Sequence, residues 1–508
     1  MLRRITISLL LCLIGISAAH GATVVRVDSD APGPVHNGSS WATAYTSIGQ
    51  ALTAVGSGAE VWIAAGIYRE SVTMTQYSKL CGGFLGYETS IAQRLVGAFP
   101  TVIDPSGAGR GIDIPNGVRS TIDGITIRNG RADDGAGIRC QGDSTTSIIN
   151  CRIENCKATN RGGGIYTARY TYGTFAGCDM VRNKALNGGG AYIENHSYPV
   201  LRNCLIIRNK ATASGGGVYG PYHAGPDFEN CTIAYNSADV SGGGAFDAYG
   251  SPMILNYCIV TFNSAPVGGG LFGGDTSSAL TYSHCDLYGN AGGDLGGAIK
   301  PALPGYGNFS ADPLFLMPDR DEFRLRLDSP CAGIGVYPLD SPYNLDRIGI
   351  AKLLPDGAQA KINRLVVSYV DGGTVYLQSP DRSTAIAVQG LSGYNAGDLL
   401  ASVVGTLGTN PAGAKILSAS GSILHATGVY TPDPLGSTIR ALSGMIGLRT
   451  KTWGRVTEVL PGGFRLSDGG TGVPVRWPGV VQLDDLVSVT GVYTIDSDLL
   501  ATEVLAQN

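Results

Sequence analysis

Two histidines and an arginine of this chain fall where a repeat would bring them together for proton-transfer chemistry. His196 and His223 each lie eight residues before a cysteine, Cys204 and Cys231 respectively. Arg169 falls beside them in the preceding unit. A polysaccharide lyase needs a base that removes a proton next to a carboxylate and a cation that holds the carboxylate. Arg169 would supply the cation, and His196 or His223 would supply the base. The alternative is that these residues have a surface or structural role, because duplication of the repeat alone would place two histidines in one register.

Two aspartates of the same region support a second chemical hypothesis. Hydrolysis of a glycosidic bond uses a pair of carboxyl groups that flank the scissile bond. The repeat would place Asp247 and Asp275 near each other. Glycoside hydrolysis by this pair is therefore a hypothesis beside proton abstraction by the histidines.

Aromatic side chains form a third pattern, which indicates binding. An aromatic residue follows a run of glycines by two positions at Tyr166, Tyr192, Tyr219, Phe246 and Phe272. Since the preceding aliphatic residue is expected to point inward, strand alternation turns these rings outward. Exposed aromatic rings bind the apolar faces of sugars. We predict ligand binding by Tyr166, Tyr192, Tyr219, Phe246 and the neighbouring Tyr222; the alternative is that adjacent turns cover the rings, which then serve in packing.

A sequence repeat over residues 120 to 298 positions these side chains. Each unit of the repeat contains a cysteine at a fixed position, which we call its anchor. The spacing between successive anchors is constant except from Cys178 to Cys204, where it is one residue shorter. The anchors are Cys151, Cys178, Cys204, Cys231, Cys258 and Cys285. Gly124 lies one further step upstream. Five residues after an anchor comes an asparagine: Asn129, Asn183, Asn209, Asn236, Asn263 and Asn290. In the unit of Cys151, Asn155 comes one place early and Cys156 takes its position. A period of about 27 residues with fixed positions is typical of a solenoid.

Each unit is too poor in helix-forming residues to be helical, and the residues after each anchor alternate. The third position forms an aliphatic column that we expect to point inward: Ile153, Met180, Ile206, Ile233, Val260 and Leu287. The second position is mixed, as a solvent-facing position allows. Triple glycines at 162–164, 188–190, 215–217, 242–244 and 268–270 permit a sharp corner between strands. We predict strand, asparagine turn, glycine corner and strand, stacked as a parallel β-helix with a spacing of roughly 4.8 Å. The asparagine column is predicted to be a turn ladder whose amides bond along the stack.

The repeat resembles that of the right-handed parallel β-helix of the pectin-lyase-like superfamily. The resemblance lies in three glycines followed by an aliphatic residue or alanine and then an aromatic residue, together with a recurrent asparagine. Within it the pattern is similar to polymorphic-outer-membrane-protein repeats, whose Phe-x-x-Asn motif Phe262–Asn263 follows loosely. The resemblance covers about residues 24–340 and implies the fold. It does not select a function, because the superfamily contains lyases, hydrolases, adhesins and binding proteins. No segment matches the catalytic or calcium motifs of pectate lyases or polygalacturonases, so no catalytic residue is transferred. No cofactor is expected, and calcium stays open without a motif for it.

The ladder cysteines are predicted to be buried free thiols. In-register strands hold Cβ atoms about 4.8 Å apart, outside the ~3.5–4.5 Å range of a disulfide. The pairing of Cys81, Cys140, Cys156 and Cys331, which lie off the ladder, is left open. No CxxC motif or nearby histidine pair indicates a metal site.

The N-terminal segment 1–21 is predicted to be a signal peptide. Arg3 and Arg4 precede an apolar run at 5–16 and then small residues. That run is shorter than the roughly 20 residues that span a membrane, and we expect no transmembrane segment in the mature chain. We therefore expect a secreted protein, extracellular or in the cell envelope. The net charge of −4 and the lack of a recognised basic cluster argue against nucleic acid as a partner.

The 508 residues suit two or three domains. We predict an all-β chain: a β-helix with an N-terminal cap at 22–337, a linker at 338–358, and OB-like β-barrel domains at 359–430 and 440–508. A helix over 47–54 should cover the open end of the first coil. Residues 307–335 break the repeat and are expected to be the last coil and cap.

The two barrels are predicted from an internal similarity between 372–407 and 462–493. Gly373 matches Gly463, Asp398 matches Asp485 and Gly405 matches Gly491. Each segment has the alternation and size of a small five-stranded barrel. We expect these barrels to be spacers or contact modules.

These features favour a secreted or cell-surface protein that binds polysaccharide or cell-envelope material, as an adhesin or carbohydrate-binding protein without catalysis. The alternative is a polysaccharide lyase or glycoside hydrolase that acts on an acidic polysaccharide.

Overall fold

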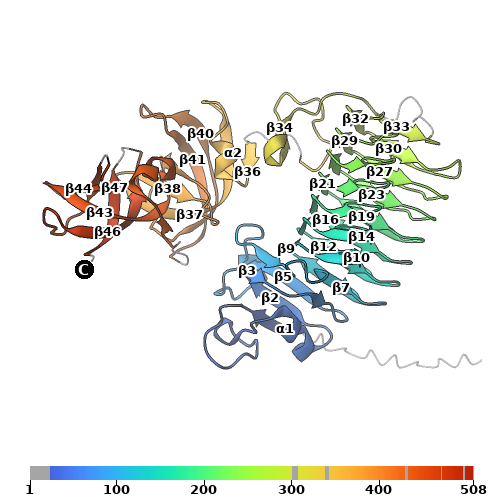
Figure 1. The fold of residues 1–508 in the computed structure, drawn as a ribbon, viewed down its shortest axis with the longest axis horizontal. Coiled ribbons are helices and arrows are strands. Elements are labelled where there is room, and N and C mark those ends of the chain that lie inside the picture. The colour runs from blue at the N-terminus through green and yellow to red at the C-terminus, as the bar shows by residue number, and fades with distance from the viewer. Residues whose placement is uncertain are drawn as a thin grey trace, which may run out of the picture.

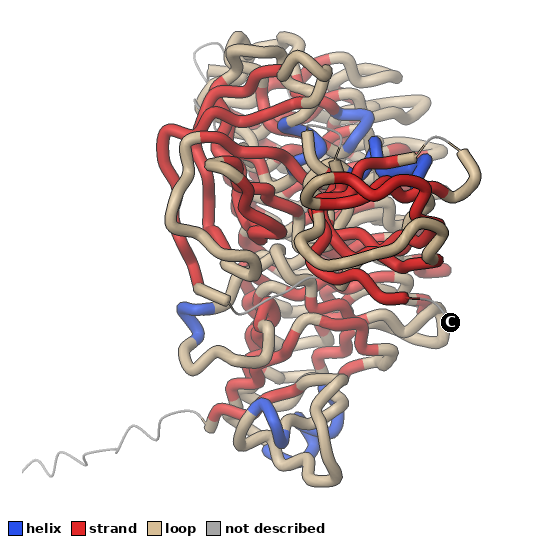
Figure 2. The backbone as a smooth tube through the Cα atoms, turned by 90° about the vertical axis from the view of Figure 1, so that its left-hand side faces the viewer, coloured by secondary structure: helices blue, strands red, loops and turns tan. Residues whose placement is uncertain are grey.

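A computed structural model describes residues 23–299, 307–337, 343–428, 433–470, 472–495 and 498–506, without the side chain of Arg440. The predicted signal peptide lies outside the described residues. Figure 1 shows a long solenoid beside two small β domains, and Figure 2 shows the same chain turned by 90°. The prediction of an all-β fold with a parallel β-helix is confirmed. In the described part of the chain, no helix has the length and apolar character needed to cross a membrane.

Three long parallel sheets, A, B and C, form the walls of the solenoid, and a short sheet D lies between B and C along each coil. Sheet A has ten strands: β1 (Val24–Val27), β2 (Glu60–Ala64), β5 (Lys79–Phe84), β8 (Arg119–Asp123), β12 (Thr145–Ile149), β16 (Tyr172–Ala176), β20 (Tyr198–Arg202), β24 (Asp227–Glu229), β28 (Ile254–Asn256) and β31 (Thr281–Ser283). Sheet B has nine: β3 (Gly66–Tyr68), β6 (Thr101–Ile103), β9 (Ile125–Arg128), β13 (Arg152–Glu154), β17 (Asp179–Val181), β21 (Leu205–Ile207), β25 (Thr232–Ala234), β29 (Ile259–Thr261) and β32 (Asp286–Tyr288).

Sheet C also has nine strands: β4 (Val72–Thr73), β7 (Ile112–Ile114), β11 (Ile138–Cys140), β15 (Ile165–Thr167), β19 (Ala191–Ile193), β23 (Val218–Gly220), β27 (Ala245–Asp247), β30 (Leu271–Gly273) and β33 (Leu295–Gly297). Sheet D has five: β10 (Arg131–Asp134), β14 (Lys157–Arg161), β18 (Lys184–Ala185), β22 (Lys210–Ala211) and β26 (Ser237–Ala238). Each regular coil therefore passes through A, B, D and C in turn.

The interior of the solenoid is built from the columns that the repeat predicts. The aliphatic column of sheet B is buried, from Ile153 and Met180 to Leu287. The six ladder cysteines are buried free thiols, as predicted, and the other four cysteines of the described chain are also free. Burial raises the pKa of Cys151 to about 12, so this thiol stays protonated and unreactive at neutral pH.

The asparagine column is a buried hydrogen-bond ladder, which confirms its structural role. The Asn209 amide donates to the carbonyl of Met180 at 2.8 Å and to Oδ1 of Asn236 at 3.0 Å. Its own Oδ1 accepts from the backbone and side-chain nitrogens of Asn183 at 2.9 and 3.1 Å. Both ends of each amide are thus satisfied inside the protein, as a buried polar group requires.

The first regular coil is one residue shorter than the sequence spacing predicted. Arg128 pairs with Glu154 in the strand register, so Asn129 lies beside Asn155 and not in line with Asn183. The alignment of Asn129 with the ladder was therefore wrong. Asn129 and Asn155 have φ values of 57° and 56°, a left-handed turn that asparagine tolerates.

The glycine corners have two separate causes. The first glycine of a triplet has positive φ, for example 66° at Gly188. The second and third meet the backbone of the next coil: a Cβ on Gly189 would lie 2.5 Å from the carbonyl oxygen of Gly216. Only glycine allows both the left-handed turn and this approach.

The N-terminal end of the solenoid is covered as predicted. Helix α1 (Ile48–Val55) begins after Ser47, whose hydroxyl accepts from the backbone of Gln50. Its residues Ile48 and Leu52 are buried in the same core as the first coils. Two short helices, η1 (Trp41–Thr43) and η2 (Ile91–Gln93), lie in the loops of this end.

Residues 307–337 form a strap along the outer face of sheet B. The strap contains β34 (Phe315–Met317), η3 (Pro318–Arg320) and β35 (Glu322–Leu325), and the two strands pair antiparallel. Phe315 and Phe323 pack on Leu205 and Ile259, which are 2% and 1% exposed. The expectation that the second position of each repeat faces solvent is therefore wrong for these coils, because the strap buries it.

The C-terminal half forms two barrels with the strand order of an OB fold, which confirms the predicted architecture. The first contains β36 (Tyr343–Leu345), α2 (Ile348–Ala351), β37 (Gln359–Asp371), β38 (Thr374–Gln378), β39 (Ala385–Gln389), β40 (Leu399–Thr409) and β41 (Lys415–Ala426). The second contains β42 (Leu435–Gly436), η4 (Ile439–Met445), β43 (Arg449–Leu460), β44 (Gly463–Ser467), β45 (Val473–Arg476), β46 (Leu486–Tyr493) and β47 (Leu499–Ala506). Pairing of β37 with β40, and of β43 with β46, closes each sheet.

The barrels pack on each other and on the solenoid. Val366 and Leu399 of the first barrel are buried against Ala98 and Phe99 of the early coils. Tyr376 of the first barrel packs with Val492 of the second. In the segment that the sequence assigned to a linker, β36 pairs with β37 and α2 is buried in the core of the first barrel.

Candidate functional site

A strip of mainly aromatic side chains, all exposed except the half-buried His196, follows the turn from sheet C to sheet A over four coils. We call it the aromatic strip; its residues are Arg169, Tyr170, Tyr172, His196, Tyr198, Tyr222, His223 and Tyr249. The five tyrosines are between 37% and 50% exposed. Coils are about 4.8 Å apart, so the strip is roughly 14 Å long, enough for several sugar rings.

The backbone of the turn aims these side chains outward. Tyr170, His196 and His223 have φ values of 59°, 57° and 61°, and Tyr222 and Tyr249 have 55° and 58°. Non-glycine residues at positive φ are uncommon, yet the same conformation occurs in other turns of the solenoid, for example at Arg208 and Tyr257. Here they recur in successive coils, so the strip is a repeated feature of the turn.

Ring-to-ring contacts join the aromatic residues of the strip into three groups. His196 lies between Tyr170 and His223, with ring centroids 5.4 Å from each. Tyr222 stacks on Tyr249 at 4.6 Å with an interplanar angle of 8°. In the adjoining strands Tyr172 stacks on Tyr198 at 6.2 Å. Each ring is held by its neighbour, so little side-chain freedom remains to be lost when a ligand binds.

The structure brings together the three residues proposed for proton abstraction. The Arg169 guanidinium lies over the Tyr170 ring, 5.0 Å from its centroid; His196 adjoins that ring, and His223 adjoins His196 one coil further on. His196 Nδ1 contacts the amide oxygen of Asn195. His223 Nδ1 lies 3.3 Å from the carbonyl of Gly250. Among the described residues, neutral acceptors and not carboxylates therefore orient the two rings.

The aromatic column predicted from the glycine spacing forms a stack, but it is largely buried. Ring centroids along Tyr166, Tyr192, Tyr219, Phe246 and Phe272 are 5.8, 5.1, 4.6 and 5.4 Å apart. Tyr166, Tyr192 and Phe246 are only 6%, 7% and 9% exposed. The rings do point away from the solenoid core, but the glycine corners and Arg161 cover them. Their geometry is that of packing, whereas Tyr222 belongs to the exposed strip.

The two aspartates proposed for hydrolysis do not share an open surface. Asp247 lies at the end of β27 with its side chain inside the solenoid, fully buried. Burial, and next the charge of Asp275, raise the pKa of Asp247 to about 8. Asp275 lies outside, where it accepts hydrogen bonds from the Ser277 hydroxyl and from the backbone of Tyr249. An acid buried inside the solenoid and a carboxylate on its surface cannot flank one glycosidic bond.

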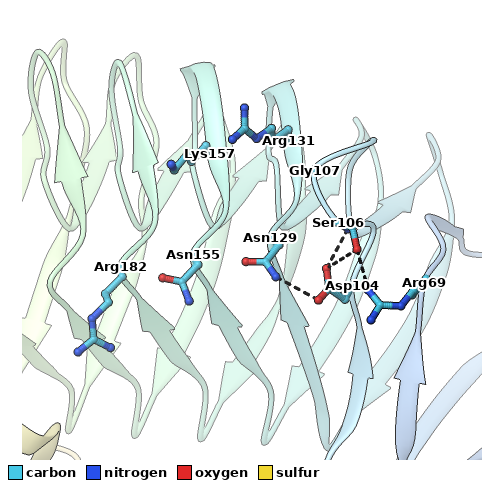
Figure 3. A pocket seen from close by; sticks show the side chains of 9 residues that line it. All are labelled: Arg69, Asp104, Ser106, Gly107, Asn129, Arg131, Asn155, Lys157 and Arg182. Atoms are coloured by element: carbon cyan, nitrogen blue, oxygen red, sulfur yellow. Dashed lines mark hydrogen bonds between the residues drawn. The ribbon is translucent and has the colours of Figure 1, made fainter.

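A second surface, which sequence reasoning missed, is basic (Figure 3). A cavity of about 620 Å³ lies where sheet B turns into sheet D. Its lining includes Arg69, Arg131, Lys157 and Arg182 and one acid, Asp104. The sequence signal was present, since a cation recurs in one register of the repeat at Arg131, Lys157, Lys184 and Lys210. In the described residues no group of three or more His, Cys, Asp or Glu side chains is placed to hold a metal ion.

Comparison with known proteins addresses the fold. A family model described as a right handed beta helix region matches residues 105–219 and 187–300. A pectin methylesterase from Aspergillus niger is similar in structure with 18% sequence identity, 58% of this chain covered, 87% of that chain covered and a TM-score of 0.30. No curated protein matches the chain.

Proposed function

Because the chain is a right-handed parallel β-helix protein, with coils that stack side chains in rows, we propose that it binds polysaccharide through the aromatic strip, without catalysis. The observation that carries this proposal is the set of five exposed tyrosines, three in the turn from sheet C to sheet A and two at the start of the adjoining sheet A strands. An exposed aromatic ring normally costs free energy in water, and a large exposed apolar surface marks an interaction site. Aromatic rings pack on the apolar faces of sugars while polar groups at the rim bind hydroxyls.

The rim of the strip has the polar groups that such binding needs. Tyr hydroxyls, the two histidine rings and the Arg169 guanidinium donate hydrogen bonds, and Arg169 adds a positive charge. The turn holds these groups in a line parallel to the solenoid axis. A linear chain laid along this line would contact one coil per step of about 4.8 Å.

The proposed location is outside the cell or in the cell envelope. Its support is the N-terminal sequence, with two arginines, an apolar run and small residues at the end of 1–21. An extended polysaccharide or an envelope component is the kind of partner that a chain at this location meets. The two OB-like barrels would then extend the protein beyond the solenoid as a contact module.

Lyase chemistry is the second candidate function, because Arg169, His196 and His223 do share the strip. Hydrolysis is disfavoured, since Asp247 is buried and Asp275 is not. Binding without reaction fits the geometry better, because within the described residues the two histidine rings contact the Asn195 amide and the Gly250 carbonyl and make no hydrogen bond to a carboxylate.

The test is a glycan array that includes neutral and uronate-bearing polysaccharides, probed with the full mature chain. We expect retention on a subset of polysaccharides with the chain length unchanged after incubation. Absence of binding to any glycan would contradict the proposal, and new unsaturated or reducing ends would replace it by the enzymatic alternative.

A further inference from the structure

Four cations form a straight row on the outside of sheet D. Arg131 pairs with Lys157, Lys157 with Lys184 and Lys184 with Lys210 in the strand register. All four side chains are exposed. We call this row the basic ladder. Parallel strands in register are about 4.8 Å apart, so the ladder places one positive charge per coil over roughly 14 Å.

Packing does not explain the ladder. Within the described chain, the side chains of Arg131, Lys157 and Lys184 make neither an ion pair nor a hydrogen bond, and only Lys210 pairs, with Asp239 at 3.1 Å. Like charges directly opposite each other on neighbouring strands destabilise a sheet. The residues that point inward beside the cations are small alanines such as Ala185 and Ala211. Apart from the surface pair of Lys210 with Asp239, the row therefore stabilises no contact in the described fold and weakens the fold slightly.

The cavity beside the ladder extends the positive surface (Figure 3). Arg69 lines one end of the cavity, away from Arg131 and Lys157, whereas the guanidinium of Arg182 at the other end is paired with Asp321 at 2.7 Å. Its one acid, Asp104, is already engaged: Arg128 Nε lies 2.8 Å from Oδ2 and the Asn129 amide lies 3.0 Å from the same oxygen. The acid is thus neutralised from within the protein, and the net charge that a ligand meets is positive.

We propose that the basic ladder and this cavity bind a linear acidic polysaccharide, one that carries a carboxylate on successive sugar rings, along the solenoid axis. A chain with regularly spaced anions matches a row of regularly spaced cations. Single-stranded nucleic acid fits less well, because proteins that bind it interleave aromatic rings with the cations, and here the neighbours are alanines. The inference goes beyond the proposed function, since the ladder and the aromatic strip lie at opposite ends of the strands of sheet C.

The experiment measures binding of the full mature chain to polygalacturonate, to neutral dextran and to a thymidine oligonucleotide at several salt concentrations. The test variant is Lys157→Gln with Lys184→Gln. Its charge-preserving control is Lys157→Arg with Lys184→Arg. A second control, Lys361→Gln with Lys451→Gln, removes the same charge from partly exposed positions in the barrels. Thermal unfolding of each variant verifies that the fold is intact.

We expect the Gln pair to weaken polygalacturonate binding by about five- to tenfold, with a smaller salt dependence, and both controls to bind like the parent. Removal of tyrosines from the aromatic strip should leave the salt-dependent part of polygalacturonate binding unchanged. The experiment therefore tests the basic ladder and the aromatic strip independently. Equal affinity of the Gln pair and the parent would overturn the proposal. So would preferential binding of the oligonucleotide, which would make the ladder a nucleic-acid site.

Discussion

The ring of Tyr222 lies flat against the ring of Tyr249 in the next coil, with centroids 4.6 Å apart and planes 8° from parallel. Both rings are about half exposed, so the pair presents an aromatic face to solvent. Because the pair belongs to a longer strip, its removal is the most direct test of the proposed binding surface.

Replacement of both rings, Tyr222→Ala with Tyr249→Ala, should weaken polysaccharide binding by about three- to tenfold per ring, because each lost stacking contact is worth on the order of 1 kcal/mol. Isothermal titration calorimetry with a glycan selected from the array measures the change. The matched control is Tyr257→Ala. Tyr257 is 42% exposed, has φ of 55° and stacks on His284 at 4.7 Å, but lies at the turn from sheet A to sheet B. A loss of binding in the control as large as in the pair would remove the strip as the site.

Histidine substitutions distinguish binding from lyase activity. We expect the parent chain to release no unsaturated ends from uronate polysaccharides, because Asn195 and Gly250, which are neutral, orient the two rings. The measurement is ultraviolet absorbance during incubation. The non-catalytic proposal fails if absorbance rises in the parent and stays flat in His196→Ala or His223→Ala.

The sequence revealed the columns of the solenoid because each column has a fixed chemical requirement. Buried aliphatic positions, a satisfied buried amide and a glycine corner recur in every coil, so periodicity alone locates Ile206, Asn209 and Gly215.

The barrels were also predictable in part. Asp398 and Asp485 each accept a hydrogen bond from the backbone three residues earlier, as their alignment predicted. The turn glycines were misaligned by one, because Gly373 corresponds to Gly462 in the strand register.

The candidate site was less predictable, because exposure depends on contacts between distant segments. Nothing local to Leu205 indicates that the strap covers it. Likewise, the rule that alternation turns Tyr192 outward is correct, yet the corners of the neighbouring coils bury the ring. The exposed tyrosines lie instead in the turn, where the left-handed backbone of residues such as Tyr170 breaks the strand alternation.

Truncation of one ladder amide should destabilise the solenoid. In Asn236→Ala, the carbonyl of Ile206 and the backbone nitrogen of Asn209 lose hydrogen bonds of 2.8 and 2.9 Å inside the protein. Each buried unsatisfied group costs about 1–3 kcal/mol, so a loss of roughly 3–5 kcal/mol is expected. Urea unfolding followed by circular dichroism measures it. Asn155→Ala is the control, since Asn155 is exposed and its side chain lies outside the ladder; equal effects of the two changes would contradict the ladder as the source of stability.

The buried Asp247 carboxyl should make stability fall as pH rises. Burial raises its pKa to about 8, from 3.8 when it is exposed, so the folded chain holds a proton that the unfolded chain releases above about pH 4. The contribution of the protonated Asp247 carboxyl to the free energy of unfolding is complete below pH 4. It is lost progressively as the pH rises to about 8, by up to ~1.4 kcal/mol per pH unit. The Asp247→Asn variant lacks this pH dependence. The difference in free energy of unfolding between the variant and the parent should therefore shift in favour of the variant by about 2–3 kcal/mol between pH 5 and pH 7. Urea unfolding at the two pH values measures the difference. Asp381→Asn, at an exposed aspartate of the first barrel, serves as the control. Parallel pH profiles of the parent and Asp247→Asn would show that the Asp247 carboxyl is charged in the folded protein.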